Sequence, residues 1–162
     1  MSHRFSSVAL NELLSVTRTG ERGFRTCAQH VASPSLRELF SAIADRRRRA
    51  AAELRELIDR CGGDPGVRCV IPGAARRGWT NLHAALTLND DGALVDECER
   101  GEDHALEVYR NALDDHLPEY VRQVVLRQFE DLMNDRQQIR MVPGEPPAGG
   151  TVVTSYGEHA RQ

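Results

Sequence analysis

Aromatic residues are scarce in this chain, at 5% of its 162 residues, and apolar and polar residues hardly ever alternate one by one. Such a sequence has little from which to build strands, because strands favour aromatic and β-branched residues in a two-residue pattern. Apolar residues instead recur every three or four positions, which is typical of amphipathic helices. The sequence therefore predicts an all-α protein, and its length suits a single domain with one core.

Long apolar runs are absent too. No segment approaches the roughly 18 apolar residues of a membrane-spanning helix, and the start, MSHRFSSVALNELL, has no secretory signal pattern. The formal net charge of −3 gives no general attraction to nucleic acids or anionic membranes. The arginine run 46–49 does not change this, because consecutive helical residues point around the helix. We therefore expect a cytoplasmic protein with no membrane or nucleic-acid partner.

Cysteine occurs only four times and never as a C-x-x-C pair. Cys27 and Cys98 lie on apolar helical faces, where we expect them to act as small buried residues. Cys61 and Cys69 flank a loop that contains glycine and proline, so a disulfide between them is the alternative to two free thiols. A reducing cytoplasm favours the free thiols.

Four long amphipathic segments account for most of the chain, with predicted helix limits of about 7–31, 34–61, 92–112 and 118–141. The connection 62–73 is long for a helical bundle and is the predicted crossover between helices 2 and 3. A short extra helix is predicted at 78–88, with a break at Asn89 before helix 3. This order predicts a ferritin-like antiparallel four-helix bundle over residues 1–142. Residues 143–162 are rich in proline and glycine and are predicted to form a tail.

A glycine followed by a glutamate interrupts the apolar stripe of two helices. Gly20-Glu21 and Gly101-Glu102 lie 81 residues apart in equivalent places, so the chain looks duplicated. At about 100° per residue, each glutamate lies at the edge of an apolar face. Two carboxylates are therefore predicted at the rim of the core.

The motifs GWxxL, NDD and CERGED are the most specific part of a resemblance that runs from Leu10 to Arg140. Over this range the chain resembles a family of bacterial ferritin-like four-helix bundles catalogued only as a domain of unknown function, number 2383. The resemblance implies a ferritin-like fold without an assigned reaction. The chain departs from the family pattern at Arg47, where a small residue or cysteine is usual, and at Arg136, where a histidine is usual.

The ligand pattern of a di-iron bundle is missing. Such a site needs a Glu-x-x-His motif on each of two helices, and no histidine of this chain has a glutamate three residues before it. The alternative to a non-catalytic protein is a relative that binds iron or manganese and has oxidase-like activity. Its ligands would come from four acidic residues, namely Glu21, Glu99, Glu102 and Asp135.

Two arginines explain the missing ligands better. Arg47 and Arg136 fall close to the apolar stripes of helices 2 and 4, and a buried guanidinium needs a carboxylate. We expect them to pair with Glu21 and Glu102 in a core network of zero net charge, with Tyr109 either bonded to a core carboxylate or simply packed. The alternative is that both arginines extend past the stripe to water. These features predict a structural or stress-related protein without a cofactor.

A homodimer is also expected. Leu106 and Leu113 lie more than about 90° from the core stripe of helix 3. With Trp79 they could form an exposed apolar strip on which a second copy packs.

Overall fold

A computed structural model of the chain describes residues 2–61 and 77–142. This part is all-α, as predicted, and contains five α-helices, one 3-10 turn and no strand. None of the described helices has both the length and the apolar character needed to span a membrane. The elements are α1 (Ser2–His30), α2 (Pro34–Arg60), η1 (Arg77–Trp79), α3 (Leu82–Leu88), α4 (Asp91–Asp114) and α5 (Glu119–Met141).

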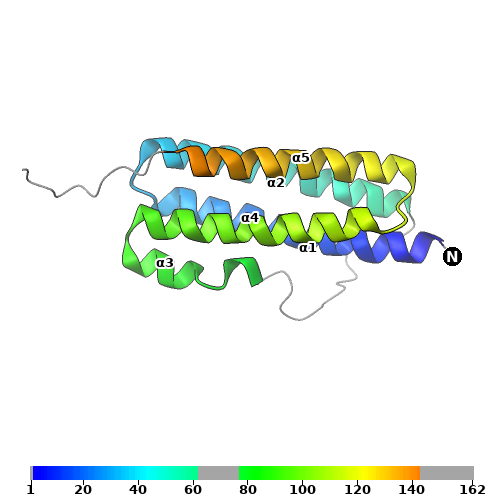
Figure 1. The fold of residues 1–162 in the computed structure, drawn as a ribbon, viewed down its shortest axis with the longest axis horizontal. Coiled ribbons are helices and arrows are strands. Elements are labelled where there is room, and N and C mark those ends of the chain that lie inside the picture. The colour runs from blue at the N-terminus through cyan, green and yellow to red at the C-terminus, as the bar shows by residue number, and fades with distance from the viewer. Residues whose placement is uncertain (1, 62–76, 143–162) are drawn as a thin grey trace, which may run out of the picture.

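The four long helices lie side by side as a helical bundle (Figure 1). α1 and α2 form one hairpin, α4 and α5 form a second, and the hairpins meet where α1 packs on α4 and α2 on α5. α2 and α4 run in the same direction, because α3 leads back along the bundle before α4 begins (Figure 1). α2 is therefore diagonally opposite α4. The predicted crossover, Cys69 and the tail 143–162 lie outside the described residues.

Short polar contacts fix the helix ends. The side chain of Ser33 accepts a hydrogen bond from the Leu36 amide at 3.4 Å, and Pro34 follows it in the first turn of α2. The carboxylate of Asp91 accepts hydrogen bonds from the amides of Ala32 and Ser33 at 2.8 and 2.9 Å. Since Asp91 starts α4, this residue ties the α1–α2 turn to the other hairpin.

The short helix predicted at 78–88 is in fact divided. Trp79 belongs to η1, and α3 begins only at Leu82. A contact with another helix accounts for the division, because the amide of Asn81 donates to Oε1 of Glu97 on α4 at 3.0 Å and fixes the chain between the two turns. Asn89 adopts a left-handed conformation, with φ of 50°, and ends α3 where the break was predicted.

Trp79 fills the groove between α1 and α4. A Cβ atom added at Gly23 or at Gly101 would come closer to its ring than Cβ atoms come in proteins, so both helices need glycine there. The ring also packs edge-on against Phe24, with centroids 5.3 Å apart. Trp79 is therefore the residue that seats η1 on the bundle.

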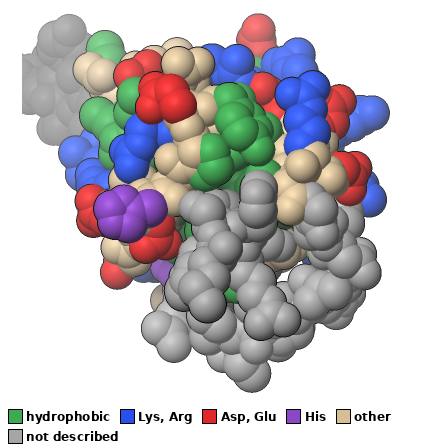
Figure 2. Space-filling view, turned by 90° about the vertical axis from the view of Figure 1, so that its right-hand side faces the viewer, with side chains coloured by type: hydrophobic (Ala, Val, Ile, Leu, Met, Phe, Trp, Pro, Cys, Tyr) green, Lys and Arg blue, Asp and Glu red, His purple; other side chains and the backbone are tan. Residues whose placement is uncertain are grey.

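The buried side chains form two apolar clusters. One contains Leu13, Leu54 and Leu132, and the other contains Phe24, Ile43 and further residues toward the α1–α2 turn. Between them along the helices lies a buried polar layer. Figure 2 shows the end of the bundle that carries the α4–α5 turn, where hydrophobic side chains form one patch bordered by acidic and basic ones.

Candidate functional site

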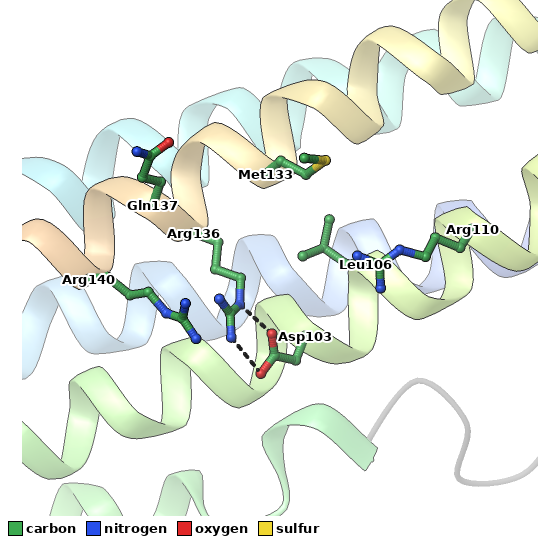
Figure 3. A pocket seen from close by; sticks show the side chains of 7 residues that line it. All are labelled: Asp103, Leu106, Arg110, Met133, Arg136, Gln137 and Arg140. Atoms are coloured by element: carbon green, nitrogen blue, oxygen red, sulfur yellow. Dashed lines mark hydrogen bonds and ion pairs between the residues drawn. The ribbon is translucent and has the colours of Figure 1, made fainter.

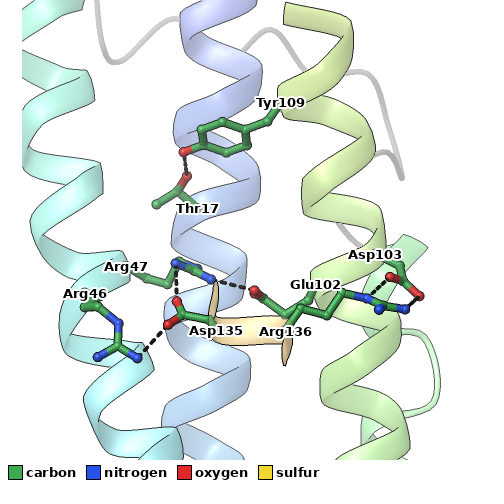
Figure 4. Close-up of polar contacts among 8 residues, drawn as sticks. All are labelled: Thr17, Arg46, Arg47, Glu102, Asp103, Tyr109, Asp135 and Arg136. Carbon is green, nitrogen blue, oxygen red and sulfur yellow. Dashed lines mark hydrogen bonds and ion pairs between the residues drawn. The ribbon is translucent and has the colours of Figure 1, made fainter. Parts of the chain in front are cut away.

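The centre of the polar layer is the guanidinium of Arg47, which α2 projects into the bundle. Its Nη2 donates to Oε2 of Glu102 at 2.6 Å, and its Nη1 lies 3.0 Å from Oδ2 of Asp135 (Figure 4). The three side chains are at most 5% exposed. Glu102 stands on α4 and Asp135 on α5, so one arginine joins three helices and crosses the diagonal of the bundle.

A second arginine completes the layer. Nη2 of Arg46 donates to Oδ1 of Asp135 at 2.6 Å, and this arginine reaches water, with a side chain that is 33% exposed. The layer thus contains two arginines and two acids and has no net charge. Gly20 on α1 faces the arginine stem, and a Cβ atom there would stand 3.8 Å from Cδ of Arg47, which is an ordinary contact distance.

Some polar atoms of the layer remain without a hydrogen bond. The buried Nε atoms of Arg46 and Arg47 have no hydrogen-bond partner, whereas Oδ2 of Asp135 keeps its ion pair with Arg47. Each such atom costs stability, because water would have satisfied it in the unfolded chain. The layer is therefore not an optimised source of stability, and its clearest effect is to fix which residues face one another.

The pKa values of Arg47 and Glu102 are both raised, but for different reasons. The carboxylates of Glu102 and Asp135 raise the pKa of Arg47 and outweigh the opposing effect of its burial, so it stays charged. Burial raises the pKa of Glu102 and outweighs the lowering effect of Arg47. Glu102 is therefore the partner that binds a proton more readily than an ordinary glutamate.

A second polar group lies next to this layer and connects all four long helices. The hydroxyl of Tyr109 donates to Oε1 of Gln128 at 2.8 Å and lies 3.0 Å from the Thr17 hydroxyl. The Gln128 amide in turn donates to the carbonyl oxygen of Ala50 at 3.2 Å. Burial raises the pKa of Tyr109 to about 12. Tyr109 is thus a buried neutral donor, and its partners are an amide and a hydroxyl, which differs from both alternatives considered for it, a core carboxylate and simple packing.

The carboxylates of the layer offer little access to a metal ion. Arg47 lies between the two central carboxylates, so a cation could reach them only by displacing the guanidinium. The other fully buried acid, Glu97, accepts from the Asn81 amide and from Nε of Arg100 at 3.2 Å. Within residues 2–61 and 77–142, no group of three or more histidine, cysteine, aspartate or glutamate residues is arranged to hold a metal ion.

The sequence was also compared with known proteins. A family model described as Domain of unknown function (DUF2383) matches residues 6–115. The chain belongs to this family. A search among curated proteins found no match. The match includes Arg47, Glu102, Thr17 and Tyr109 but ends before α5, so Asp135 comes from outside the matched part.

Two of the predicted core residues are misplaced. Glu21 is outside the layer, with a side chain that is 25% exposed and lies 3.7 Å from Nη2 of Arg25. Arg136 turns to the surface, where its Nε and Nη2 bond the exposed carboxylate of Asp103. The prediction that both arginines enter the core was wrong for Arg136, since its side of α5 faces Asp103 of α4.

The predicted apolar strip was also wrong. Leu106 is only 5% exposed and belongs to the core, while Leu113 and Trp79 are partly buried against it. The helix that carries Leu106 and Leu113, α4, packs on three sides, against α1, α3 with η1, and α5, so its buried arc is wider than one stripe. Glu99, a proposed metal ligand, is partly exposed and lies outside the layer. Cys61 carries a free thiol that contacts Tyr120, and its suggested partner is not among the described residues.

Asp135 and Glu97 are the buried acids whose role the sequence reasoning missed. Asp135 follows Leu132 by three residues and precedes Ile139 by four, so the helical period does place it on the buried face. Glu97 follows Leu94 by three residues in the same way. The signal that indicates both acids is their spacing of three or four residues from buried apolar residues of the same helix.

Proposed function

We propose that this chain is a ferritin-like four-helix bundle whose centre is held by an ion-pair layer instead of a metal site, and that it serves as a non-catalytic structural protein. Support for the fold comes from the order of the helices, in which two hairpins are joined so that α2 and α4 run in the same direction (Figure 1). Ferritin-like bundles have this single long crossover. The observation that carries the function is the position of Arg47 between Glu102 and Asp135.

A di-metal centre does not fit these residues. Such a centre in a bundle uses four carboxylates and two histidines that project inward from all four helices. Here α1 contributes Gly20 at this level, α2 contributes an arginine, and only α4 and α5 contribute acids. The guanidinium already supplies the positive charge that a metal ion would supply. The layer therefore holds the bundle together without a redox-active ion.

Metal loading tests this proposal. The full chain is incubated with Fe²⁺ or Mn²⁺, passed through a desalting column and analysed by mass spectrometry of the elements. We expect far less than one metal ion per chain, and no difference between the wild type and Glu102→Gln. Glu107→Gln is the matched control, because it removes an acid from the exposed side of the same helix. Stoichiometric iron or manganese that Glu102→Gln abolishes and Glu107→Gln retains would establish the metal-binding alternative.

A further inference from the structure

A surface groove runs between α4 and α5, on the side of these helices away from the polar layer. It has a volume of about 560 Å³ and is lined by Leu106 and Met133 in its middle and by charged side chains along its length (Figure 3). Met133 is 48% exposed, and Leu126, two turns before it on α5, is 44% exposed. A groove with exposed apolar residues between charged edges is typical of a protein interface.

The two edges of the groove carry opposite charges. On α4, Glu99, Asp103 and Glu107 follow one another at intervals of four residues and form an acidic ridge. On α5, Arg136 and Arg140 form a basic ridge with the same interval. Among the described residues, only Asp103 and Arg136 form an ion pair across the groove. Arg110 is the one basic residue that lines the groove on the α4 side, and it lies toward the other end. At the end that holds Glu99 and Asp103, the face is therefore divided lengthwise into an acidic half and a basic half.

Two contacts show which residues of the antiparallel helices stand at the same level. Asp103 bonds Arg136, and the guanidinium of Arg110 lies 5.6 Å from the centre of the Phe129 ring. Moving four residues along each helix from the first contact brings Glu99 level with Arg140, about 6 Å away along the groove at 1.5 Å per residue. The acidic and basic ridges are thus in register.

We propose that this face binds a second copy of the chain about a twofold axis parallel to the groove. Rotation about that axis places α4 of each copy over α5 of the other and leaves every residue at its own level. Glu99 of one copy then faces Arg140 of the other, and Asp103 faces Arg136. The acidic half meets the basic half twice, while Met133 and Leu126 become covered.

The size of the face suits a dimer. Helices of 23 and 24 residues are about 35 Å long. Two such helices, each about 10 Å across and packed about 9 Å apart, present a face about 19 Å wide, which gives an area of roughly 600 to 700 Å². Stable interfaces bury about 800 Å² per partner. The α4–α5 face alone therefore provides most of what a specific dimer needs.

A small anion or an acidic peptide fits this face less well. Arg136 and Arg140 lie one turn apart, but Arg136 is already bonded to Asp103, so an anion there would have to compete with that carboxylate. An acidic ligand would also lie against the acidic ridge of α4, where like charges repel. A partner with both ridges in the same register avoids this repulsion, and a second copy has that arrangement.

Charge-reversal substitutions test the proposed dimer, with its dissociation measured by analytical ultracentrifugation. The wild type should sediment as a concentration-dependent dimer of the 18.1 kDa chain. Arg140→Glu should weaken dimerisation on the order of 100-fold or more, because two like-charge contacts form in each dimer. Glu99→Arg should do the same. Arg55→Glu makes the same charge change on an exposed position of α2 and should leave the dimer unchanged.

Mixing the two variants gives the decisive measurement. In a mixture of Arg140→Glu and Glu99→Arg chains, a dimer with one chain of each kind again has opposite charges at both of these contacts between copies. Dimers should therefore return in the mixture and contain one chain of each kind. A monomeric wild type at 100 μM, or variants that separate the dimer without recovery on mixing, would overturn the proposal.

Discussion

The most informative perturbation of this protein is to remove Arg47 and Glu102 singly and together. Arg47→Met leaves Glu102 buried without its partner, while Asp135 keeps Arg46 at 2.6 Å. Glu102→Leu is milder, because Arg47 keeps Asp135 at 3.0 Å. Breaking a buried pair costs about 3 to 5 kcal/mol, so we assign the upper value to Arg47→Met and the lower value to Glu102→Leu.

The double variant should be far more stable than the sum of the single losses. Arg47→Met with Glu102→Leu leaves the Arg46–Asp135 pair intact and replaces a buried ion pair by apolar side chains of similar length. Such replacements are often neutral or stabilising, so the double variant should lie within about 2 kcal/mol of the wild type. The coupling energy would then be about 6 kcal/mol or more.

Urea denaturation of the wild type, both single variants and the double variant measures this cycle. Arg136 and Asp103 provide the matched control, since they form an ion pair of the same kind on the surface. Each single change there should cost no more than about 1 kcal/mol. Losses at Arg47 and Glu102 that add within about 0.5 kcal/mol would refute the idea that the two charges depend on each other.

Three further predictions follow from the same interior. Burial raises the pKa of Glu102 above its ordinary 4.5. The folded chain therefore holds this proton more tightly, and the stabilisation present below pH 4.5 is lost as the pH rises through the raised pKa. Relative to Glu102→Gln, the free energy of unfolding of the wild type should fall with increasing pH across this window, and a rise would contradict the assignment. The pKa of Tyr109 is raised from 10.0 to about 12, so the wild type should lose stability between these pH values, and Tyr109→Phe should remove that loss in alkaline urea titrations. Gly101→Ala should displace Trp79, cost about 1 to 3 kcal/mol and shift the tryptophan fluorescence to the red, whereas Gly20→Ala meets only ordinary contacts and should stabilise α1 by up to about 1 kcal/mol. Equal effects at the two glycines, measured by thermal unfolding, would show that the ring does not depend on Gly101.

The helices could be predicted from the sequence because their ends are encoded locally. Ser33 with Pro34, the left-handed Asn89 and Pro118 before α5 mark boundaries that do not depend on the rest of the chain. Periodicity also placed Arg47 on the inner face of its helix. The division of the short helix at Asn81 could not be predicted, because its cause is Glu97 on another helix.

Periodicity could not choose between Asp135 and Arg136. The first is three residues after Leu132 and four before Ile139, and the second is four after and three before, so both lie equally close to the buried stripe. The choice depends on the neighbours, since α2 offers Arg47 on one side and α4 offers Asp103 on the other. Those neighbours are known only once the helices are packed.

The apparent duplication was misleading for a related reason. Gly20 and Gly101 occupy equivalent places in the two helices, but Gly20 faces the stem of Arg47 at an ordinary contact distance, whereas Gly101 leaves the room that Trp79 needs. Glu102 points to the centre, whereas Glu21 is left at the edge near Arg25. Internal similarity predicted two equivalent carboxylates at the rim of the core and could not show that their neighbours differ.

The separation of the ion partners along the chain also matters while the protein is being made. Arg47 leaves the ribosome 55 residues before Glu102, and Arg46 leaves 89 residues before Asp135. The α1–α2 hairpin can form first, because N-terminal units fold as they emerge, and its arginines then remain hydrated. A hydrated guanidinium in the middle of the hairpin divides the exposed apolar surface of the hairpin into two smaller patches. Smaller apolar patches limit contacts with other nascent chains. The cost of removing water from Arg47 is postponed until α4 and α5 arrive with the carboxylates that offset it.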